Sequence, residues 1–264
     1  MTPYLGYIGA LLIGIILGLT GGGGSILTVP VLVYLIGLNP MVATAYSLFI
    51  VGTTATFGTI QNLKKKVVSV KIGLQFAIPS LFSVYLTRRF LVPIIPEVLI
   101  ENPHFILTRS TFLMVLFACI MFFAALSMLK KQAEKQEDVI QKEQNLLLVV
   151  LQIFSVGILI GLIGAGGGFL IIPALFHIAK LPMRKAIGTS LLIIAINSLI
   201  GFTGDIENTT IDWSFLLGFT AIAILGIYIG IYLNKFINEN QLKKGFGWFV
   251  LVMAIFIFIK ELLY

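Results

Sequence analysis

The chain has 264 residues, of which 58% are hydrophobic and 11% are charged, and its mean hydropathy is +1.05. A soluble globular domain has about 45–50% apolar and about 25% charged residues, so this chain has too few charges to cover an ordinary water-facing surface. The composition excludes a secreted, collagenous, disordered or nucleic-acid-binding protein. The net charge of +7 comes from basic residues in short runs between apolar stretches, a pattern typical of loops that orient membrane helices.

Ten apolar segments follow one another along the chain, and together they predict an all-α, polytopic membrane helical bundle. They are residues 4–20, 24–37, 43–61, 70–91, 107–129, 146–163, 168–180, 186–203, 213–233 and 245–263. A helix needs about 20 apolar residues to span the hydrocarbon core, and most segments approach that length. The segments 24–37 and 168–180 are shorter, and each follows a glycine cluster. No basic run precedes the first segment, so no removable signal peptide is expected.

A charged stretch at 130–145 separates two membrane repeats, 1–129 and 146–264, and is interpreted as a solvated cytoplasmic linker. The two repeats align without a gap over about 45 residues at an offset of 143, which places Gly18 on Gly161 and Pro30 on Pro173. Leucine matches are common in such a composition, but the joint match of glycines, prolines and serines indicates an internal duplication.

Loop charges predict that the second repeat is inverted. The loop after the third segment carries Lys64–Lys66, whereas its counterpart after the eighth segment carries Asp205 and Asp212. Basic loops stay on the cytoplasmic side, so the linker is expected inside and both termini outside a multi-pass protein of the plasma or inner membrane. The main exceptions are Arg88, Arg89 and Arg109. Inverted repeats are typical of transporters that work by alternating access around a site near the midplane.

The two glycine clusters are the strongest candidates for a binding site. They contain Gly21, Gly22, Gly23 and Gly24, followed by Ser25, in the first repeat, and Gly164, Gly166, Gly167 and Gly168 in the second. Irregular backbone at membrane depth is tolerated only where it is buried in protein or lines a cavity, so a broken or re-entrant helix is expected in each repeat. The freed N–H groups and helix N-termini then face a small anion. The alternative is that the glycines serve close helix packing.

Polar residues on the third and eighth segments form a second candidate set. Ser47 and Ser190 match across the repeats, and their hydroxyls are expected to donate to an oxyanion or to bond back to the helix backbone. Asn197 is expected to face protein or water rather than lipid. By contrast, Gly226 and Gly230, with Ser83 and Thr87 at the equivalent positions, predict a packing seam.

Several kinds of chemistry have no residues to support them. No acidic residue lies well inside an apolar segment, so no carboxylate proton relay is expected, and basic residues are expected to be absent from the deep core. The single cysteine, Cys119, excludes an intramolecular disulfide, and no cluster of histidine, cysteine and carboxylate predicts a metal. No cofactor and no enzymatic activity are predicted.

At the glycine clusters the sequence resembles the TauE/SafE (TSUP, sulfite exporter) family of membrane transporters. The resemblance rests on the duplicated glycine-rich stretch followed by Pro30 or Pro173, and on the Ala-x-x-x-Ser pattern at Ala43–Ser47 and Ala186–Ser190. Gly-Asp followed by Asp-Trp, at 204–205 and 212–213, reinforces it. The resemblance implies movement of sulfite, sulfonates and related small sulfur-containing anions, often outward.

The leading hypothesis is therefore a transporter of a small sulfur-containing oxyanion that works by alternating access. Its expected partners are the anion, the lipid bilayer and a coupling ion, H⁺ or Na⁺, with no nucleic acid. One alternative is an anion channel or passive pore of the same architecture. Another is a membrane-embedded enzyme or assembly factor, which lacks a visible catalytic constellation. The sequence leaves the oligomeric state open.

Overall fold

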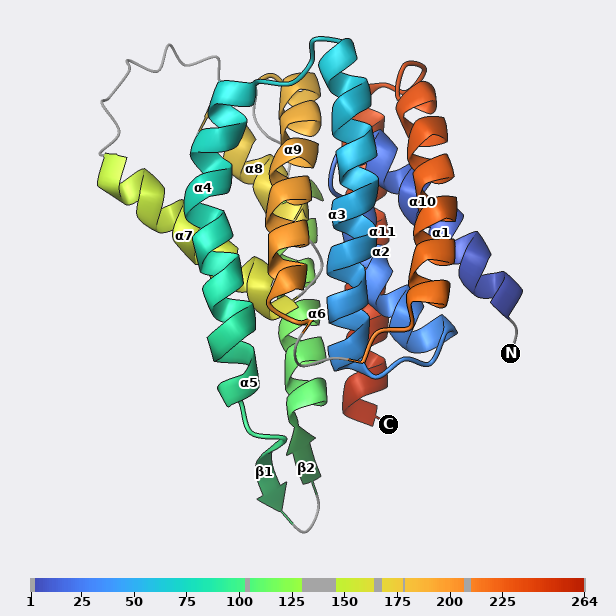
Figure 1. Ribbon diagram of the computed structural model, residues 1–264, viewed down its shortest axis with the longest axis vertical. Coiled ribbons are helices and arrows are strands. Elements are labelled where there is room, and N and C mark those ends of the chain that lie inside the picture. The colour runs from blue at the N-terminus through green and yellow to red at the C-terminus, as the bar shows by residue number, and fades with distance from the viewer. Residues whose placement is uncertain are drawn as a thin grey trace.

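Figure 1 shows a computed structural model of the chain, a bundle of helices with a short β-hairpin at one end. The structure describes residues 3–102, 105–129, 146–163, 168–177, 179–206 and 210–263. Each apolar segment expected from the sequence forms a helix, so the predicted all-α membrane bundle is confirmed. Among the described residues, four helical stretches are long and apolar enough to cross a membrane: Pro40–Lys64, Val70–Ile94, Arg184–Thr203 and Trp213–Leu233.

The first half forms six α-helices and two π-helical turns. These are α1 (Pro3–Thr20), α2 (Gly24–Pro30), the turn η1 (Val31–Leu35), α3 (Pro40–Lys64), α4 (Val70–Leu86), the turn η2 (Thr87–Leu91), α5 (Val92–Ile94) and α6 (Arg109–Leu129). Helix α3 starts where its sequence favours a start, because Asn39 accepts a hydrogen bond from the Met41 N–H and Pro40 occupies the first turn. Strands β1 (Val98–Asn102) and β2 (Phe105–Thr108) form an antiparallel hairpin in a segment expected to be a loop.

The second half forms five helices that correspond to those of the first. They are α7 (Leu146–Ile163), α8 (Gly168–His177), α9 (Met183–Thr203), α10 (Trp213–Leu233) and α11 (Glu239–Leu263). Equivalent positions make equivalent hydrogen bonds after the two short helices: the Leu38 N–H donates to Leu32, and the Leu181 N–H donates to Leu175. The duplication seen in the sequence therefore extends to the local backbone.

Helices α3 and α9 lie side by side at the centre of the bundle and run in opposite directions (Figure 1). Along their contact, Gly201 meets Leu48 near one end and Gly58 meets Leu191 near the other. These two helices occupy equivalent positions in the repeat, so their antiparallel course is the one that an inverted repeat requires.

Small residues let two other helix pairs approach closely. Gly14 and Gly18 of α1 face Gly226 and Gly230 of α10, with backbone against backbone. The equivalent pair brings Gly157 and Gly161 of α7 against Ser83 of α4 and Thr87 of η2. The expectation that Gly226 and Gly230 form a packing seam is confirmed, because a Cβ atom at either position would overlap main-chain atoms of α1.

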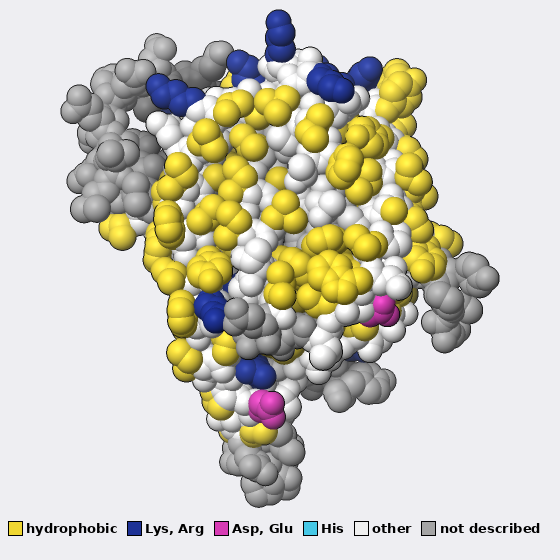
Figure 2. Space-filling view, in the orientation of Figure 1, with side chains coloured by type: hydrophobic (Ala, Val, Ile, Leu, Met, Phe, Trp, Pro, Cys, Tyr) yellow, Lys and Arg dark blue, Asp and Glu magenta, His cyan; other side chains and the backbone are white. Residues whose placement is uncertain are grey.

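The outer surface separates apolar and basic side chains. Figure 2 shows hydrophobic side chains over much of the visible face of the bundle, while most of the visible lysine and arginine side chains lie at the end of the α3–α4 loop. Exposed apolar residues include Ile78 and Phe82 on α4 and Leu217 and Leu225 on α10. Such a belt is too extensive for a water-facing monomer and is suited to lipid.

Replacing Gly226 with alanine should destabilise the folded protein by about 1–3 kcal/mol, because the added methyl group overlaps the Leu11 carbonyl oxygen across the α1–α10 seam. The apparent melting temperature in detergent measures this effect. Gly218→Ala on the same helix is the matched control, because its Cβ would meet no described atom within 4 Å. Equal melting temperatures for the two variants would contradict the tight seam.

Candidate functional site

The first glycine cluster breaks a helix, as predicted. Helix α1 ends at Thr20 and α2 begins at Gly24. Gly21 between them has a φ of +73°, a conformation that strains any residue with a side chain. The Thr20 hydroxyl accepts a hydrogen bond from the Gly23 N–H at 2.8 Å, which holds the turn between α1 and α2. In the second repeat α7 ends at Ile163 and α8 begins at Gly168, while Gly164, Gly166 and Gly167 lie outside the described residues.

The first break meets the start of the second short helix, α8, inside the protein. The backbones of Gly22 and Gly168 touch, and a Cβ atom on Gly22 would lie 2.5 Å from the Gly168 carbonyl carbon. Gly21 rests on the backbone of Ile187 at the start of α9. All of Gly21–Gly24 is buried. The structure therefore brings together residues from both halves that the sequence identified separately, in a closed and tightly packed arrangement.

Two of the predicted serines donate their hydroxyl hydrogens to this break. Ser25 Oγ donates to the Gly22 carbonyl at 2.6 Å. Ser190 Oγ lies 2.5 Å from the Gly21 carbonyl oxygen and 2.8 Å from that of Ile187 in its own helix. A hydroxyl has a single hydrogen to donate, so neither serine is ready to bind an anion until these bonds open.

Buried polar residues occur along both α3 and α9, and we call this set the polar ladder. On α3 it comprises Thr44, Ser47, Thr54, Thr59 and Asn62, and on α9 it comprises Thr189, Ser190, Asn197 and Ser198. Within the described part of the chain, no hydrogen-bond partner is found for Ser47 Oγ, Thr54 Oγ1, Asn197 Oδ1 or Ser198 Oγ. Unpaired buried polar atoms each cost about 1–3 kcal/mol, so a row of them indicates a place that water or a polar solute visits.

Asn197 and Thr54 occupy equivalent positions of the two repeats near the middle of the ladder. The Asn197 Nδ2 atom donates to Ser80 Oγ of α4 at 2.7 Å. The side chain therefore faces protein, as expected from the cost of placing an amide in lipid. Its carbonyl oxygen remains among the unpaired atoms named above.

A cavity of about 120 Å³, here called the basic pocket, opens next to the first break. Its lining includes Gly18, Asn62, Lys65, Arg184, Ile187, Asn234 and Lys235. Ile187 connects the two features, because it lines the pocket and also packs on Gly21. The Asn234 amide lies 2.5 Å from the Leu19 carbonyl oxygen and fixes the end of α10 to the end of α1. Three cations and two amides around a small volume favour an anion.

The electrostatics of the basic pocket point the same way. Partial desolvation lowers the pKa of the Lys65 ammonium, and the positive charge of Lys235 nearby lowers it further. Two like charges held close together repel each other, and an anion placed between them relieves that repulsion. The pocket is therefore prepared for negative charge by the arrangement of its cations.

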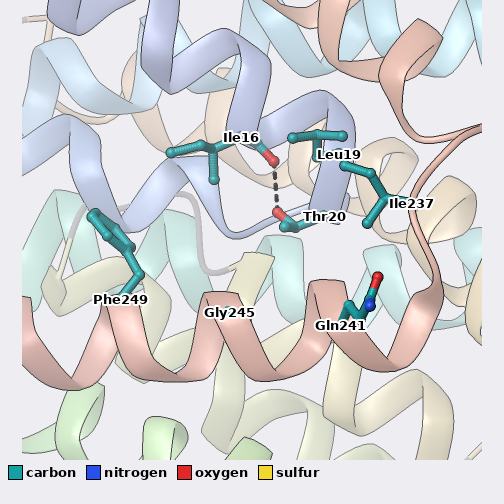
Figure 3. A pocket seen from close by; sticks show the side chains of 7 residues that line it. All are labelled: Ile16, Leu19, Thr20, Ile237, Gln241, Gly245 and Phe249. Atoms are coloured by element: carbon teal, nitrogen blue, oxygen red, sulfur yellow. Dashed lines mark hydrogen bonds between the residues drawn. The ribbon is translucent and has the colours of Figure 1, made fainter.

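Two larger cavities have a different character. Figure 3 shows one of about 320 Å³ between the end of α1 and α11, where the Thr20 hydroxyl donates to the Ile16 carbonyl and the Gln241 amide faces the cavity. The other, of about 500 Å³, runs along α1, α2 and α11 and is lined mainly by apolar side chains such as Leu27 and Met253. Their apolar linings suit acyl chains better than a small anion.

One functional feature was not anticipated from the sequence. The expectation that basic residues are absent from the deep core is wrong, because Arg88 in η2 is only 1% exposed. Its Nη1 atom donates to Thr44 Oγ1 at 3.2 Å, and its Nε atom lies 3.5 Å from Asp205 Oδ2. The offset of 143 pairs Asp205 with Asn62, which lines the basic pocket. This correspondence was the signal in the sequence that could have pointed to Asp205 and its partner Arg88.

Comparison with known proteins identifies close similarities over nearly the whole chain. The profile of the family described as Sulfite exporter TauE/SafE matches residues 7–257. A probable membrane transporter protein of Xylella fastidiosa is 30% identical over 253 residues, which cover 93% of this chain and 91% of the relative. The probable membrane transporter protein YunE of Bacillus subtilis is 26% identical over 245 residues, covering 85% and 86%. No solved structure matches.

Substituting Gly22 with alanine should force the two breaks apart, because its methyl group would overlap the Gly168 backbone. A well-folded Gly22→Ala protein is expected to transport solute about tenfold or more slowly than the parent. The reason is that overpacking destabilises the closed conformation, which the transport cycle requires, by about 1–3 kcal/mol. Flux in proteoliposomes measures it. Gly245→Ala is the control, since no described atom lies within 4 Å of its added Cβ. Undiminished flux in Gly22→Ala would show that this close contact is dispensable.

Proposed function

Because the chain belongs to the TauE/SafE family of sulfite exporters and is thus a multi-pass membrane transporter, we propose that it exports a small sulfur-containing oxyanion by alternating access. The substrate class is sulfite or an organosulfonate. The proposed role is transport rather than catalysis.

The observation that carries this proposal is the position of the basic pocket directly beside the first glycine break. Lys65, Arg184 and Lys235 attract the anion to the pocket, and Ile187 separates the pocket from Gly21. Beyond Ile187, the contact of Gly22 with Gly168 blocks the way. The basic pocket lies at one end of the bundle, and packed backbone lies beyond it. This arrangement favours alternating access rather than a continuously open pore.

In this mechanism the breaks bind the anion once they separate. Main-chain amides of both glycine clusters would then be available, and Ser25 and Ser190 would exchange their carbonyl partners for the oxyanion. Ser47, whose hydroxyl is unpaired on the polar ladder, would receive the anion next, and Asn197 would offer its Nδ2 atom once the bond to Ser80 opens. The predicted substrate-binding residues therefore act in succession along α3 and α9.

The distribution of charge supports an orientation. Lysine and arginine gather at the end that holds the basic pocket (Figure 2), and basic loops stay on the cytoplasmic side of membranes. We place this end in the cytoplasm, with residues 130–145 as a cytoplasmic linker between repeats 1–129 and 146–264 and both termini outside. The pocket then receives its anion from the cytoplasm, which is the direction that export requires.

Sulfite flux in proteoliposomes containing the purified protein tests the proposal. Saturable flux, with counterflow driven by unlabelled sulfite, is the expected result. Flux that does not saturate would instead favour a channel, and no flux of sulfite or alkyl sulfonates would refute the substrate class. Imposed H⁺ or Na⁺ gradients in the same vesicles identify the coupling ion.

Removing one cation from the basic pocket should weaken the apparent affinity for the anion. Lys65→Gln and Lys235→Gln each remove a charge whose attraction is worth about 1 kcal/mol in a solvated pocket, so a roughly fivefold rise in KM is expected. Lys71→Gln is the matched control, because Lys71 is an exposed lysine outside the pocket lining. A similar effect of all three substitutions would indicate general surface attraction rather than a site.

The lowered pKa of Lys65 gives the affinity a pH dependence of definite sign. The anion binds the protonated ammonium, so affinity should fall by several-fold as pH rises through the lowered pKa, which lies below the ordinary lysine value of about 10.4. Methanesulfonate is the appropriate probe because its charge does not change in this range. Lys65→Arg stays protonated and should flatten the profile. An unchanged profile in that variant would exclude Lys65 as the titrating group.

A further inference from the structure

The Arg88 cluster lies at the opposite end of the α3–α9 pair from the basic pocket. Thr44 is near the start of α3, whereas Lys65 follows its end. Arg184 is near the start of α9, whereas Asp205 follows its end. Because α3 and α9 run antiparallel, Thr44 and Asp205 share one end of the bundle (Figure 1). Arg88 reaches them from η2, a π-helical turn, and such turns often occur at functional sites.

Arg88 is buried but incompletely satisfied. Its Nη1 atom has the hydrogen bond to Thr44, while Nε and Nη2 lack a hydrogen-bond partner among the described residues. We call Nε and Nη2 the open donors. The Asp205 carboxylate is close enough for an ion pair with Nε, yet at 3.5 Å it forms no hydrogen bond. The guanidinium therefore retains a positive charge and a pair of unused donors inside the protein.

A purely structural ion pair accounts poorly for this geometry. Burying two charges is repaid only when they meet in close geometry and their remaining donors and acceptors are hydrogen bonded. Here the two donors along one edge of the guanidinium stay open, and Asp205 Oδ2 also lacks a hydrogen-bond partner in the described chain. Two donors of a buried guanidinium are therefore available to a further hydrogen-bond acceptor.

An oxyanion has the chemistry that the open donors require. Nε and one terminal nitrogen of a guanidinium form a planar fork that binds two oxygens of a carboxylate or similar oxyanion at once. Building on the proposed transport of sulfur oxyanions, we propose that Arg88 is a second anion-binding station on the path. In the conformation seen here, Asp205 occupies that station as an internal substitute for the substrate.

Competition between Asp205 and the substrate then couples binding to opening. Without substrate, the Arg88–Asp205 pair joins η2 to the end of α9 and keeps this end shut. An oxyanion that arrives along the polar ladder takes the open donors, and Asp205 is released into water. Gly204 lets the end of α9 lie close to η2, because a Cβ atom on it would lie 3.2 Å from Arg88 Cβ.

Three variants separate an anion station from a structural pair. Asp205→Asn removes the competitor, so stabilisation of the detergent-solubilised protein by methanesulfonate should appear at about tenfold lower concentration. Arg88→Lys keeps the charge but loses the fork, and should raise the required concentration about tenfold. The double variant Arg88→Gln/Asp205→Asn removes both buried charges. It should fold like the parent but lose both the anion-dependent stabilisation and transport.

A matched control uses a second arginine–carboxylate pair. Arg109 Nη2 lies 4.0 Å from Glu97 Oε1 beside the hairpin, and the Glu97 side chain is exposed. Glu97→Gln should leave anion stabilisation and flux unchanged. Any effect that it shares with Asp205→Asn would reflect net charge rather than the Arg88 station.

The outcomes decide the inference independently of the proposed function. Parent-like transport in the folded double variant, or unchanged anion affinity in Asp205→Asn, would overturn the role of Arg88 and leave sulfur-oxyanion transport intact. If the parent moves no sulfur oxyanion, the proposed function fails, yet a gain of anion stabilisation in Asp205→Asn that disappears in the double variant would still establish the station.

Discussion

Direct contact of backbone with backbone is the constraint on which this architecture depends. Between the two halves it occurs where Gly22 meets Gly168 and where α1 crosses α10 at Gly226 and Gly230. Lipid supplies no hydrophobic drive for helices to associate, so their association relies on close packing and buried polar contacts. Side-chain-free positions permit that packing, and they also bring main-chain amides and carbonyls within reach of a solute path.

Buried polar groups are concentrated along α3 and α9. These two central helices carry unpaired hydroxyls and an unpaired amide oxygen, whereas the outer helices present apolar surfaces. The basic pocket lies at one end of this row and the Arg88–Asp205 pair at the other. In the proposed mechanism the same polar groups serve the inward-facing and the outward-facing conformation. This is possible because α3 and α9 are equivalent helices of the two repeats and run antiparallel.

Much of the fold could be predicted from the sequence, because hydrophobic length and the glycine breaks are local properties. Positions 24–37 and 168–180 stood out by their shortness and became the helices that begin at Gly24 and Gly168. Arg88 could not be recognised, because its burial depends on Asp205 and Thr44, which are distant in sequence. The β1–β2 hairpin was missed because it lies between the apolar segments 70–91 and 107–129. The bond of Ser190 to Gly21 joins residues that are distant in sequence, whereas Ser25 bonds to Gly22 three residues before it.

The unequal ends of the central helix pair have a thermodynamic consequence. In a perfectly symmetrical inverted duplication, the inward-facing and outward-facing forms would be related by a two-fold rotation and would have the same free energy. Asn62 stands at one end where Asp205 stands at the other, so the Arg88–Asp205 ion pair has no carboxylate counterpart at the equivalent position. Without substrate, the transporter should therefore favour the conformation that is open to the lysine-rich side. The two facing conformations then differ in free energy, and the protein has a preferred resting state.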